Sequence, residues 1–276
     1  MSQQQVARAS PAITPVGTIW RRRSLIWQLA SRDVESRYRA SVLGVLWAVA
    51  LPVAMFGVYL LVFTTVLRAR WETPAGNSTE VALFIFSGLI LFTLFSETVN
   101  RAPYLITEAP HFVKKVVFPL EILPVVALVS AMLPLAVGTI ILFAAMLATA
   151  TAVPWTAVYF PLLAVPIALL ALGCSWLLSA MAVYLQDLRH VVGVLVTMLL
   201  FLTPIFYPSA VLPAELRWVH DWSPIAWAIE TSKDVLFWGQ AIDWREYGLV
   251  LCASALAAWL GYRFFMASKR GFADVM

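Results

Sequence analysis

Apolar residues fill six stretches of this 276-residue chain, and each stretch is long enough to cross a lipid bilayer. A helix rises about 1.5 Å per residue, so roughly 20 apolar residues span the roughly 30 Å hydrocarbon layer. The stretches are apolar on every face, whereas barrel strands alternate apolar and polar residues, so they predict helices. The sequence therefore predicts an all-α integral membrane protein with six transmembrane helices, near 44–67, 81–104, 117–149, 154–184, 190–207 and 245–267.

The distribution of basic residues predicts the orientation of these spans. With a cytoplasmic N-terminus, 14 of the 19 lysines and arginines fall on the inner side, and cytoplasmic loops typically carry such an excess. Both termini are therefore expected in the cytoplasm. The first 16 residues lack the apolar core of a signal peptide, and residues 1–17 are expected to be disordered. The net charge of +4 gives no reason to expect nucleic-acid binding.

Residues 18–40 predict a separate amphipathic helix that lies along the inner membrane surface. Thr18 is a suitable N-cap for it. Arginines occupy one face, and the opposite face carries apolar side chains at helical spacing, namely Ile26, Ala30, Val34 and Tyr38. The helix is interpreted either as a membrane anchor alone or as an anchor that also contacts a cytoplasmic partner. Residues 41–276 would then form the six-helix membrane domain.

The outer segment 208–243 differs from the spans because prolines divide it into short pieces. Ser223 followed by Pro224 is a typical helix start, and Gly239 is a typical helix end. The helix between them is too polar to cross the bilayer and too apolar to sit freely in water. It should lie at the outer interface or dip into the membrane against the bundle.

Residues for catalysis or metal binding do not occur in a recognisable pattern. The three histidines fall in loops without metal-ligand spacing, and the phosphate-binding loop of ATPases is missing. We therefore expect no catalytic residue, no metal and no cofactor in this chain. Charged residues within the spans cluster near helix ends, which argues against a proton-driven carrier. Glu97, Asn100 and Arg101 are expected to form a local pair near the inner interface.

Aromatic side chains are the candidate substrate-contacting groups. Interfacial belts and core packing account for most of them, but several fall inside the first and fifth spans: Trp47, Phe56, Tyr59, Phe63, Phe201, Phe206 and Tyr207. Tyr59 and Phe63 share one helix face at i, i+4 spacing. A flat ring with a polar edge suits sliding contact with the C–H face of a sugar.

Four stretches together resemble the permease subunits of ABC-2 type polysaccharide exporters, which export O-antigen, teichoic acid or related capsule-like glycans. The stretches are RDVESRYRASVLGVLWAVALP (32–52), HFVKKVVFPLEILP (111–124), YLQDLRHVVGVLVTMLLFLTPIFYP (184–208) and SPIAWAIETSKDVLFWG (223–239). The resemblance covers nearly the whole chain in family order, and it identifies the family rather than the substrate. Ser223 stands where the family usually has asparagine, and serine also caps a helix.

The resemblance implies that this chain is one half of a homodimer, with twelve spans around one channel. Two copies of a separate cytoplasmic ABC ATPase subunit would bind beneath it and hold ATP and Mg. The substrate would be a lipid-linked polysaccharide, moved across the bacterial cytoplasmic (inner) membrane. Spans one and five would line the channel, which makes the seven aromatic residues above the channel-lining candidates.

The same resemblance assigns roles to the polar ends of the bundle. ATPase motion would be transmitted by the amphipathic helix and two inner loops, with charged candidates Glu108, Lys114, Lys115, Asp187 and Arg189. The outer segment would form a gate that includes Trp227, Phe237 and Trp238. Arg37 and Arg39 are candidates for binding the lipid diphosphate, because arginine forks match phosphate oxygens. Ordinary positive-inside charge is the alternative interpretation of these two arginines.

Three other functions stay open at this point. An ABC-2 exporter of drugs or small lipids would have the same topology. An integral-membrane glycosyl or acyl transferase acting on lipid-linked substrates would need an acid, base or metal cluster at an interface. A scaffold or assembly subunit would support no ATP-dependent translocation.

Overall fold

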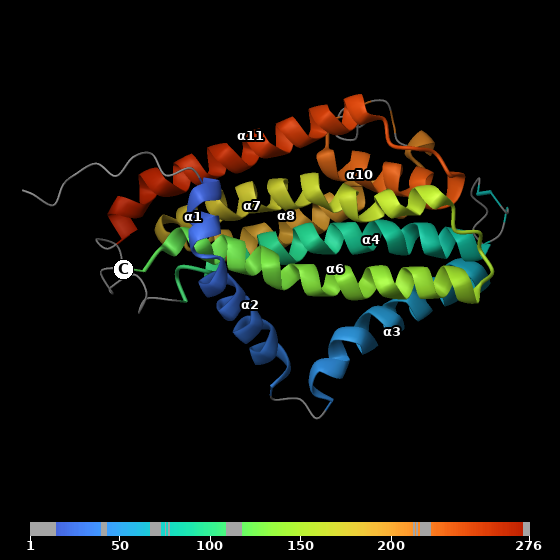
Figure 1. Cartoon of the computed structure of the whole chain (residues 1–276), viewed down its shortest axis with the longest axis horizontal. Helices are drawn as coiled ribbons and strands as arrows, with labels where there is room; N and C mark the ends of the chain where they lie inside the picture. The colour runs from blue at the N-terminus through green and yellow to red at the C-terminus, as the bar shows by residue number, and fades with distance from the viewer. Residues whose placement is uncertain are drawn as a thin grey trace, which may run out of the picture.

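The computed structural model describes residues 15–39, 43–66, 73, 74, 76, 78–108, 118–211, 213, 215 and 222–272, and every regular element in these ranges is helical (Figure 1). Five helical segments in the described part are long and apolar enough to cross a membrane, and a sixth is shorter. The main helices are α1 (Pro15–Arg21), α2 (Arg23–Tyr38), α3 (Trp47–Leu61), α4 (Ser78–Arg101), α6 (Leu123–Ala148), α7 (Phe160–Tyr184), α8 (Leu188–Leu202), α10 (Pro224–Lys233) and α11 (Trp244–Ser268).

Short helical turns extend several of these helices. The π-helical turn η2 (Val62–Val66) continues α3, and a second, η8 (Asp234–Trp238), continues α10. The 3₁₀ turns are η1 (Gly44–Leu46), η3 (Ala102–Tyr104), η4 (Leu120–Ile122), η5 (Trp155–Tyr159), η6 (Ser209–Val211) and η9 (Lys269–Gly271).

The helix α4 forms the centre of the bundle, with α6 and α7 on either side of it (Figure 1). Most of its side chains are buried, from Glu80 to Val99. In contrast, Ala48 is the buried residue of α3. The helix α3 diverges from the bundle at its N-terminal end, so its apolar side chains are largely uncovered in a single chain.

The helices α7 and α11 pack backbone against backbone at two glycines. A Cβ built on Gly261 would lie 2.1 Å from the carbonyl oxygen of Gly173, and one on Gly173 would lie 2.6 Å from that of Ala257. Only glycine permits this approach, and small residues serve the same purpose in membrane helix pairs generally. Ser175 of α7 and Ser254 of α11 are also buried.

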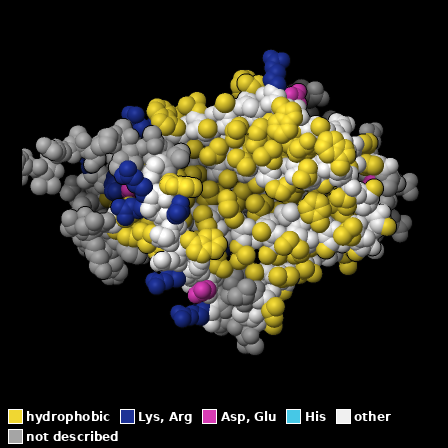
Figure 2. Space-filling model, viewed as in Figure 1, with side chains coloured by type: hydrophobic (Ala, Val, Ile, Leu, Met, Phe, Trp, Pro, Cys, Tyr) yellow, Lys and Arg dark blue, Asp and Glu magenta, His cyan; other side chains and the backbone are white. Residues whose placement is uncertain are grey.

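The helix predicted for residues 18–40 is present as two helices, α1 and α2, which are divided at Arg22. It begins at Pro15, so Thr18 lies inside α1 and its predicted role as N-cap was wrong. Of the side chains predicted for its apolar face, Ile26 and Ala30 are buried, and α2 packs against α6. Lysines and arginines visible in Figure 2 gather mostly at the end of the bundle that carries α1 and α2, while the long sides are hydrophobic.

The predicted helix in the outer segment is confirmed with both of its ends. The Oγ of Ser223 accepts a hydrogen bond from the backbone N–H of Ala226, and Gly239 ends the helix in the left-handed region at φ 66°. The side chain of Phe237 is buried against Phe84, with 4.3 Å between ring centroids. This segment therefore packs against α4 and α7. Of the two placements that the sequence left open, this is the one against the bundle.

The fifth predicted span is shorter in the structure than in the sequence pattern. The helix α8 ends at Leu202 instead of continuing to 207. Thr203 is extended, at φ −84° and ψ 137°, because the residue before a proline is disfavoured in the helical region. The hydroxyl of Tyr207 shares its one hydrogen between the carbonyl oxygens of Phe201 and Leu202, at 2.9 and 3.0 Å, both of which are orphan acceptors of the helix end.

Candidate functional site

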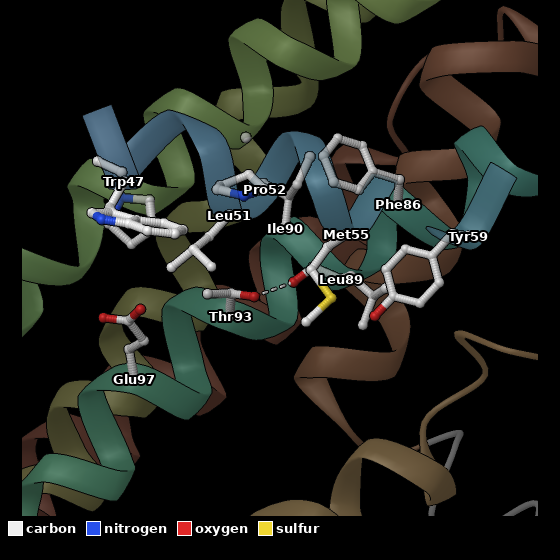
Figure 3. Close-up of a pocket in the computed structure, with 13 residues that line it drawn as sticks. Trp47, Leu51, Pro52, Met55, Tyr59, Phe86, Leu89, Ile90, Thr93 and Glu97 are labelled. Carbon is white, nitrogen blue, oxygen red and sulfur yellow. Dashed lines mark hydrogen bonds between the residues drawn. The ribbon is translucent and has the colours of Figure 1, made fainter. Parts of the chain in front are cut away.

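A groove of about 300 Å³ lies between α3 and α4, with α6 behind it (Figure 3). We call it the α3–α4 groove. Apolar side chains make up most of its wall. Its lining residues are Trp47, Ala48, Leu51, Pro52, Met55 and Tyr59 of α3, Phe86, Leu89, Ile90, Thr93 and Glu97 of α4, and Pro134 and Gly138 of α6.

Two backbone features shape this groove. Pro52 lies inside α3 and has no N–H, so the carbonyl of Ala48 loses its intrahelical partner within the groove wall. On the opposite side, a Cβ on Gly138 would come within 2.9 Å of Ile90, so this glycine lets α4 approach α6 closely. Pro52 thus leaves one backbone acceptor of α3 without its usual helical donor, and Gly138 brings α6 close to α4 beside the groove.

Polar groups stand at the two ends of the groove. Figure 3 places Glu97 near Trp47 at one end and the hydroxyl of Tyr59 at the other. Between them, the hydroxyl of Thr93 donates to the carbonyl of Leu89 at 2.7 Å, so its hydrogen is used within its own helix. Such a surface can hold an apolar chain or the faces of sugar rings, and it contains no arrangement of nucleophile and base.

Four charged side chains connect α2 to α4, and one of them, Glu97, lines the end of the groove near Trp47. Arg37 Nη1 donates to Glu97 Oε2 at 2.8 Å and Nη2 donates to Asp33 Oδ2 at 3.4 Å. Arg101 Nη1 donates to Asp33 Oδ2 at 2.8 Å, and its Nη2 also contacts that carboxylate. We call these four residues the α2–α4 ion-pair cluster.

The electrostatics of this cluster favour the charged form of Asp33. Partial burial of Asp33 raises the pKa of its carboxyl, but hydrogen bonding and charge attraction from Arg101, with a smaller attraction from Arg37, outweigh burial. The pKa of Asp33 therefore lies below its ordinary value of 3.8. Salt bridges of this kind, with three or more members and partial burial, hold two helices more firmly than isolated surface pairs.

The local pair predicted for Glu97, Asn100 and Arg101 was wrong. Glu97 and Arg101 share a face of α4 at i, i+4 spacing, and both side chains reach across to α2 instead of to each other. No sequence pattern places α2 beside α4, so these ion-pair partners could not be predicted. The prediction that Arg37 binds a lipid diphosphate stays a prediction, and its guanidinium is already paired with two carboxylates. Arg39 is exposed.

The predicted channel-lining aromatic residues occupy different surroundings. In α3 and η2, Trp47 and Tyr59 line the groove, while Phe56 and Phe63 are half-buried against the core, Phe56 at 4.9 Å from the ring of Phe86. In and after α8, the side chain of Phe201 is 63% exposed and lies 5.9 Å from the ring of Phe206. Tyr207 uses its hydroxyl to cap α8, as described above.

Two of the predicted ATPase-coupling residues, Glu108 and Arg189, lie near Tyr104, the last residue of η3. The Arg189 guanidinium stacks over the ring of Tyr104 at 5.7 Å, and the hydroxyl of Tyr104 donates to the Arg189 carbonyl at 3.4 Å. Glu108 lines a cavity of about 400 Å³ together with Tyr104. Asp187, which is exposed, directly precedes α8. Lys114 and Lys115 lie outside the described residues.

The predicted gate residues do not share one surface. Phe237 is buried in the core, and Trp238 is exposed. Trp227 is directed toward α11, where its Nε1 donates to Glu246 Oε2 at 3.1 Å. Within the described residues, no group of three histidine, cysteine, aspartate or glutamate side chains could hold a metal ion.

Comparisons with known proteins address the whole chain. Residues 24–237 match the family described as ABC-2 type transporter. The "O-antigen export system permease protein RfbA" of Myxococcus xanthus is 27% identical over 262 residues, which cover 94% of this chain and 98% of that protein. A protein of the same description from Klebsiella pneumoniae is 23% identical over 254 residues, or 91% of this chain and 95% of the relative.

Proposed function

Because the chain belongs to the ABC-2 type transporter family, whose membrane permease subunits lack an ATPase domain, we propose that it exports a lipid-linked polysaccharide of the O-antigen class. The observation that carries this proposal is the similarity to O-antigen export permeases over 94% of the chain. The aromatic groove supports it, because ring faces and a tyrosine hydroxyl suit contact with sugars. The protein is a multi-pass component of the cytoplasmic membrane.

The proposed topology has six crossings with both termini in the cytoplasm. The fifth crossing is α8, which is 15 residues long and thus about 22 Å. This is shorter than the roughly 30 Å hydrocarbon layer, and the turn at 203–208, which folds back on the end of α8, would lie within the remaining depth. An even number of crossings keeps the arginines near α1 and the basic residues of η9 on one side.

Energy would come from ATP hydrolysed by two copies of a separate cytoplasmic ATPase. The contact between Tyr104 and Arg189 offers a route for this coupling, because it joins the inner end of α4 to the first turn of α8. A push on either segment is then transmitted to both helices. The exposed Glu108 and Asp187 provide charged contacts for the ATPase at the same end.

The substrate path would run along α3 and α8 in a homodimer. Both helices expose most of their apolar side chains in the single chain, so a second copy and the substrate would cover them. Arg39 would contact the lipid diphosphate, whereas Arg37 would do so only by leaving Glu97 and Asp33. The gate would be formed by α10 and η8, which are held against α4 and α7.

The first experiment tests the energy source and the cargo. Deleting the gene for this chain should abolish surface polysaccharide, and deleting the gene for its ATPase partner should give the same loss. Glycan export that continues without the ATPase would refute the proposal.

The second experiment tests the path. Tyr59→Ala and Phe206→Ala should reduce export and alter polysaccharide chain length, because each removes a ring proposed to contact the polymer. Trp259→Ala on α11 is the matched control, since it removes an exposed aromatic residue far from the groove. Export and chain length equal to those of the control would exclude a lining role.

An exporter of small lipids is the second candidate, and the volume of the groove favours it. About 300 Å³ is the lower end of ligand pockets and suits one small amphiphile. ATP-dependent transport of a short-chain fluorescent lipid into reconstituted vesicles, without any effect of the gene deletion on surface polysaccharide, would decide for this alternative.

A further inference from the structure

A second and larger cavity lies between α10 and α11, near the end of the bundle at which α11 begins. Its volume is about 810 Å³, within the range of pockets that bind small molecules. We call it the α10–α11 groove. Its lining residues are Trp222, Ser223, Pro224, Trp227, Glu230, Thr231 and Asp234 on one side and Glu246, Leu249, Val250 and Ala253 on the other.

The polarity of this groove changes along its length. Two indoles, those of Trp222 and Trp227, lie at the start of α10, where Trp227 bonds to Glu246 in the first turn of α11. Glu230 and Asp234 line the groove further along α10. Leu249, Val250 and Ala253 follow on the next turns of α11. The apolar wall then continues on the membrane-facing surface of that helix, where Leu256 and Leu260 are exposed.

The charged residues of the groove favour a positively charged group as its ligand. No lysine or arginine of the described part of the chain lines it. The ammonium of Lys233, on the same helix, is directed elsewhere, because its Nζ donates to the carbonyl of Pro204 at 2.8 Å. A bare phosphate would therefore meet carboxylates alone, whereas an ammonium would meet carboxylates and aromatic faces, which together bind cations well.

The hydrogen bond between Trp227 and Glu246 holds both side chains in place before any ligand binds. The Nε1 of Trp227 donates to Glu246 Oε2 at 3.1 Å, which orients the indole and the carboxylate across the groove from each other. The ring of Trp227 also packs on Tyr247, at 6.0 Å between centroids. A cation entering beside Glu246 thus meets a ring whose position is already fixed, which lowers the entropy cost of binding.

We propose that the α10–α11 groove binds a membrane lipid with an ammonium head group, such as phosphatidylethanolamine. The ammonium lies beside the two indoles and the carboxylate of Glu246, and the first part of an acyl chain lies along Leu249, Val250 and Ala253. The exported glycan is the less favourable occupant, because α11 lies on the opposite side of the bundle from α3 (Figure 1). This inference rests on the groove alone and is independent of the cargo.

The test is lipid binding by the purified full-length protein in detergent, measured by native mass spectrometry. Dioleoylphosphatidylethanolamine should bind, and dioleoylphosphatidylglycerol, which has the same chains and no ammonium, should bind much more weakly. Glu246→Gln and Trp222→Ala should each weaken phosphatidylethanolamine binding by about fivefold or more. Glu215→Gln is the matched control, because it removes an exposed carboxylate outside the groove.

The two variants differ in their risk to folding, so a loss of lipid binding can be distinguished from a loss of structure. Glu246 is in the first turn of α11 and bonds to Trp227, so its replacement can also affect folding. The side chain of Trp222 is 85% exposed, so its removal is expected to leave the fold unaffected. Equal binding of the two lipids, unchanged binding by Trp222→Ala, or displacement of the lipid by a soluble oligosaccharide of the exported glycan would each overturn the proposal.

Discussion

Replacing Gly261 by alanine should separate α7 from α11. The added Cβ would lie 2.1 Å from the carbonyl oxygen of Gly173, and ordinary van der Waals contact begins at 3.4 Å, so the two helices must part by about 1.3 Å. The atom in the way belongs to the backbone of a helix and cannot rotate aside. The strain therefore spreads along the whole contact between the two helices.

The expected loss of stability follows from this geometry. Overpacking of a well-packed interior costs about 1–3 kcal/mol, and a collision with backbone falls at the upper end of that range. Alanine has the better helix propensity and returns about 1 kcal/mol. The free energy of unfolding should therefore fall by about 2 kcal/mol.

The measurement is reversible unfolding of the purified protein in bicelles, with Gly248→Ala as the matched control. Gly248 lies on the same helix, and a Cβ built there meets nothing within 4 Å. The control should be as stable as the native protein or slightly more stable. If Gly261→Ala unfolds at the same free energy as Gly248→Ala, the close backbone contact is not what holds these helices together.

Three further predictions concern the ends of the bundle. Asp33→Ala and Arg101→Ala should each destabilise the protein by about 1–3 kcal/mol, and a double-mutant cycle should give a coupling of about 1 kcal/mol or more; additive effects would contradict the ion pair. Because the pKa of Asp33 is lowered, this contribution is complete above its ordinary pKa of 3.8 and is lost as the pH falls through the lowered value. Protease sensitivity of α2 should increase in that acidic range, and Asp33→Asn should show no such transition. Ser223→Ala should remove the α10 cap and cost about 1 kcal/mol, whereas Ser223→Asn should preserve it; hydrogen exchange of α10 distinguishes the two.

Much of the architecture could be predicted because lipid imposes strict rules. Uninterrupted apolar runs must be helices in a membrane, and the structure has helices at each predicted span. The α10 helix was also predictable, since Ser223, Pro224 and Gly239 act through local backbone chemistry. The end of α8 was missed, although Pro204 was a visible signal that the residue before it would leave the helix.

The candidate sites were less predictable because they depend on which faces meet. A run that is apolar all round, such as α7, gives no indication of its inward face. Gly173 and Gly261 are distant in the sequence and match no local motif, so their contact could not be inferred. In the same way, Glu97 and Arg101 pair with α2 across long sequence separations, and the groove beside them arises only from the packing of α3 on α4.

The contact between Gly173 and Gly261 also affects which helices of this transporter can move relative to one another. Two helices that interlock through their main chains cannot slide past one another without a collision, so α7 and α11 form a fixed frame. The helices with few buried side chains, α3 and α8, are the natural moving parts, because little packing is lost when they shift. During transport we therefore expect α3 and α8 to move relative to α7 and α11, which stay fixed to each other. The α2–α4 ion-pair cluster would hold α2 against α4 during this movement.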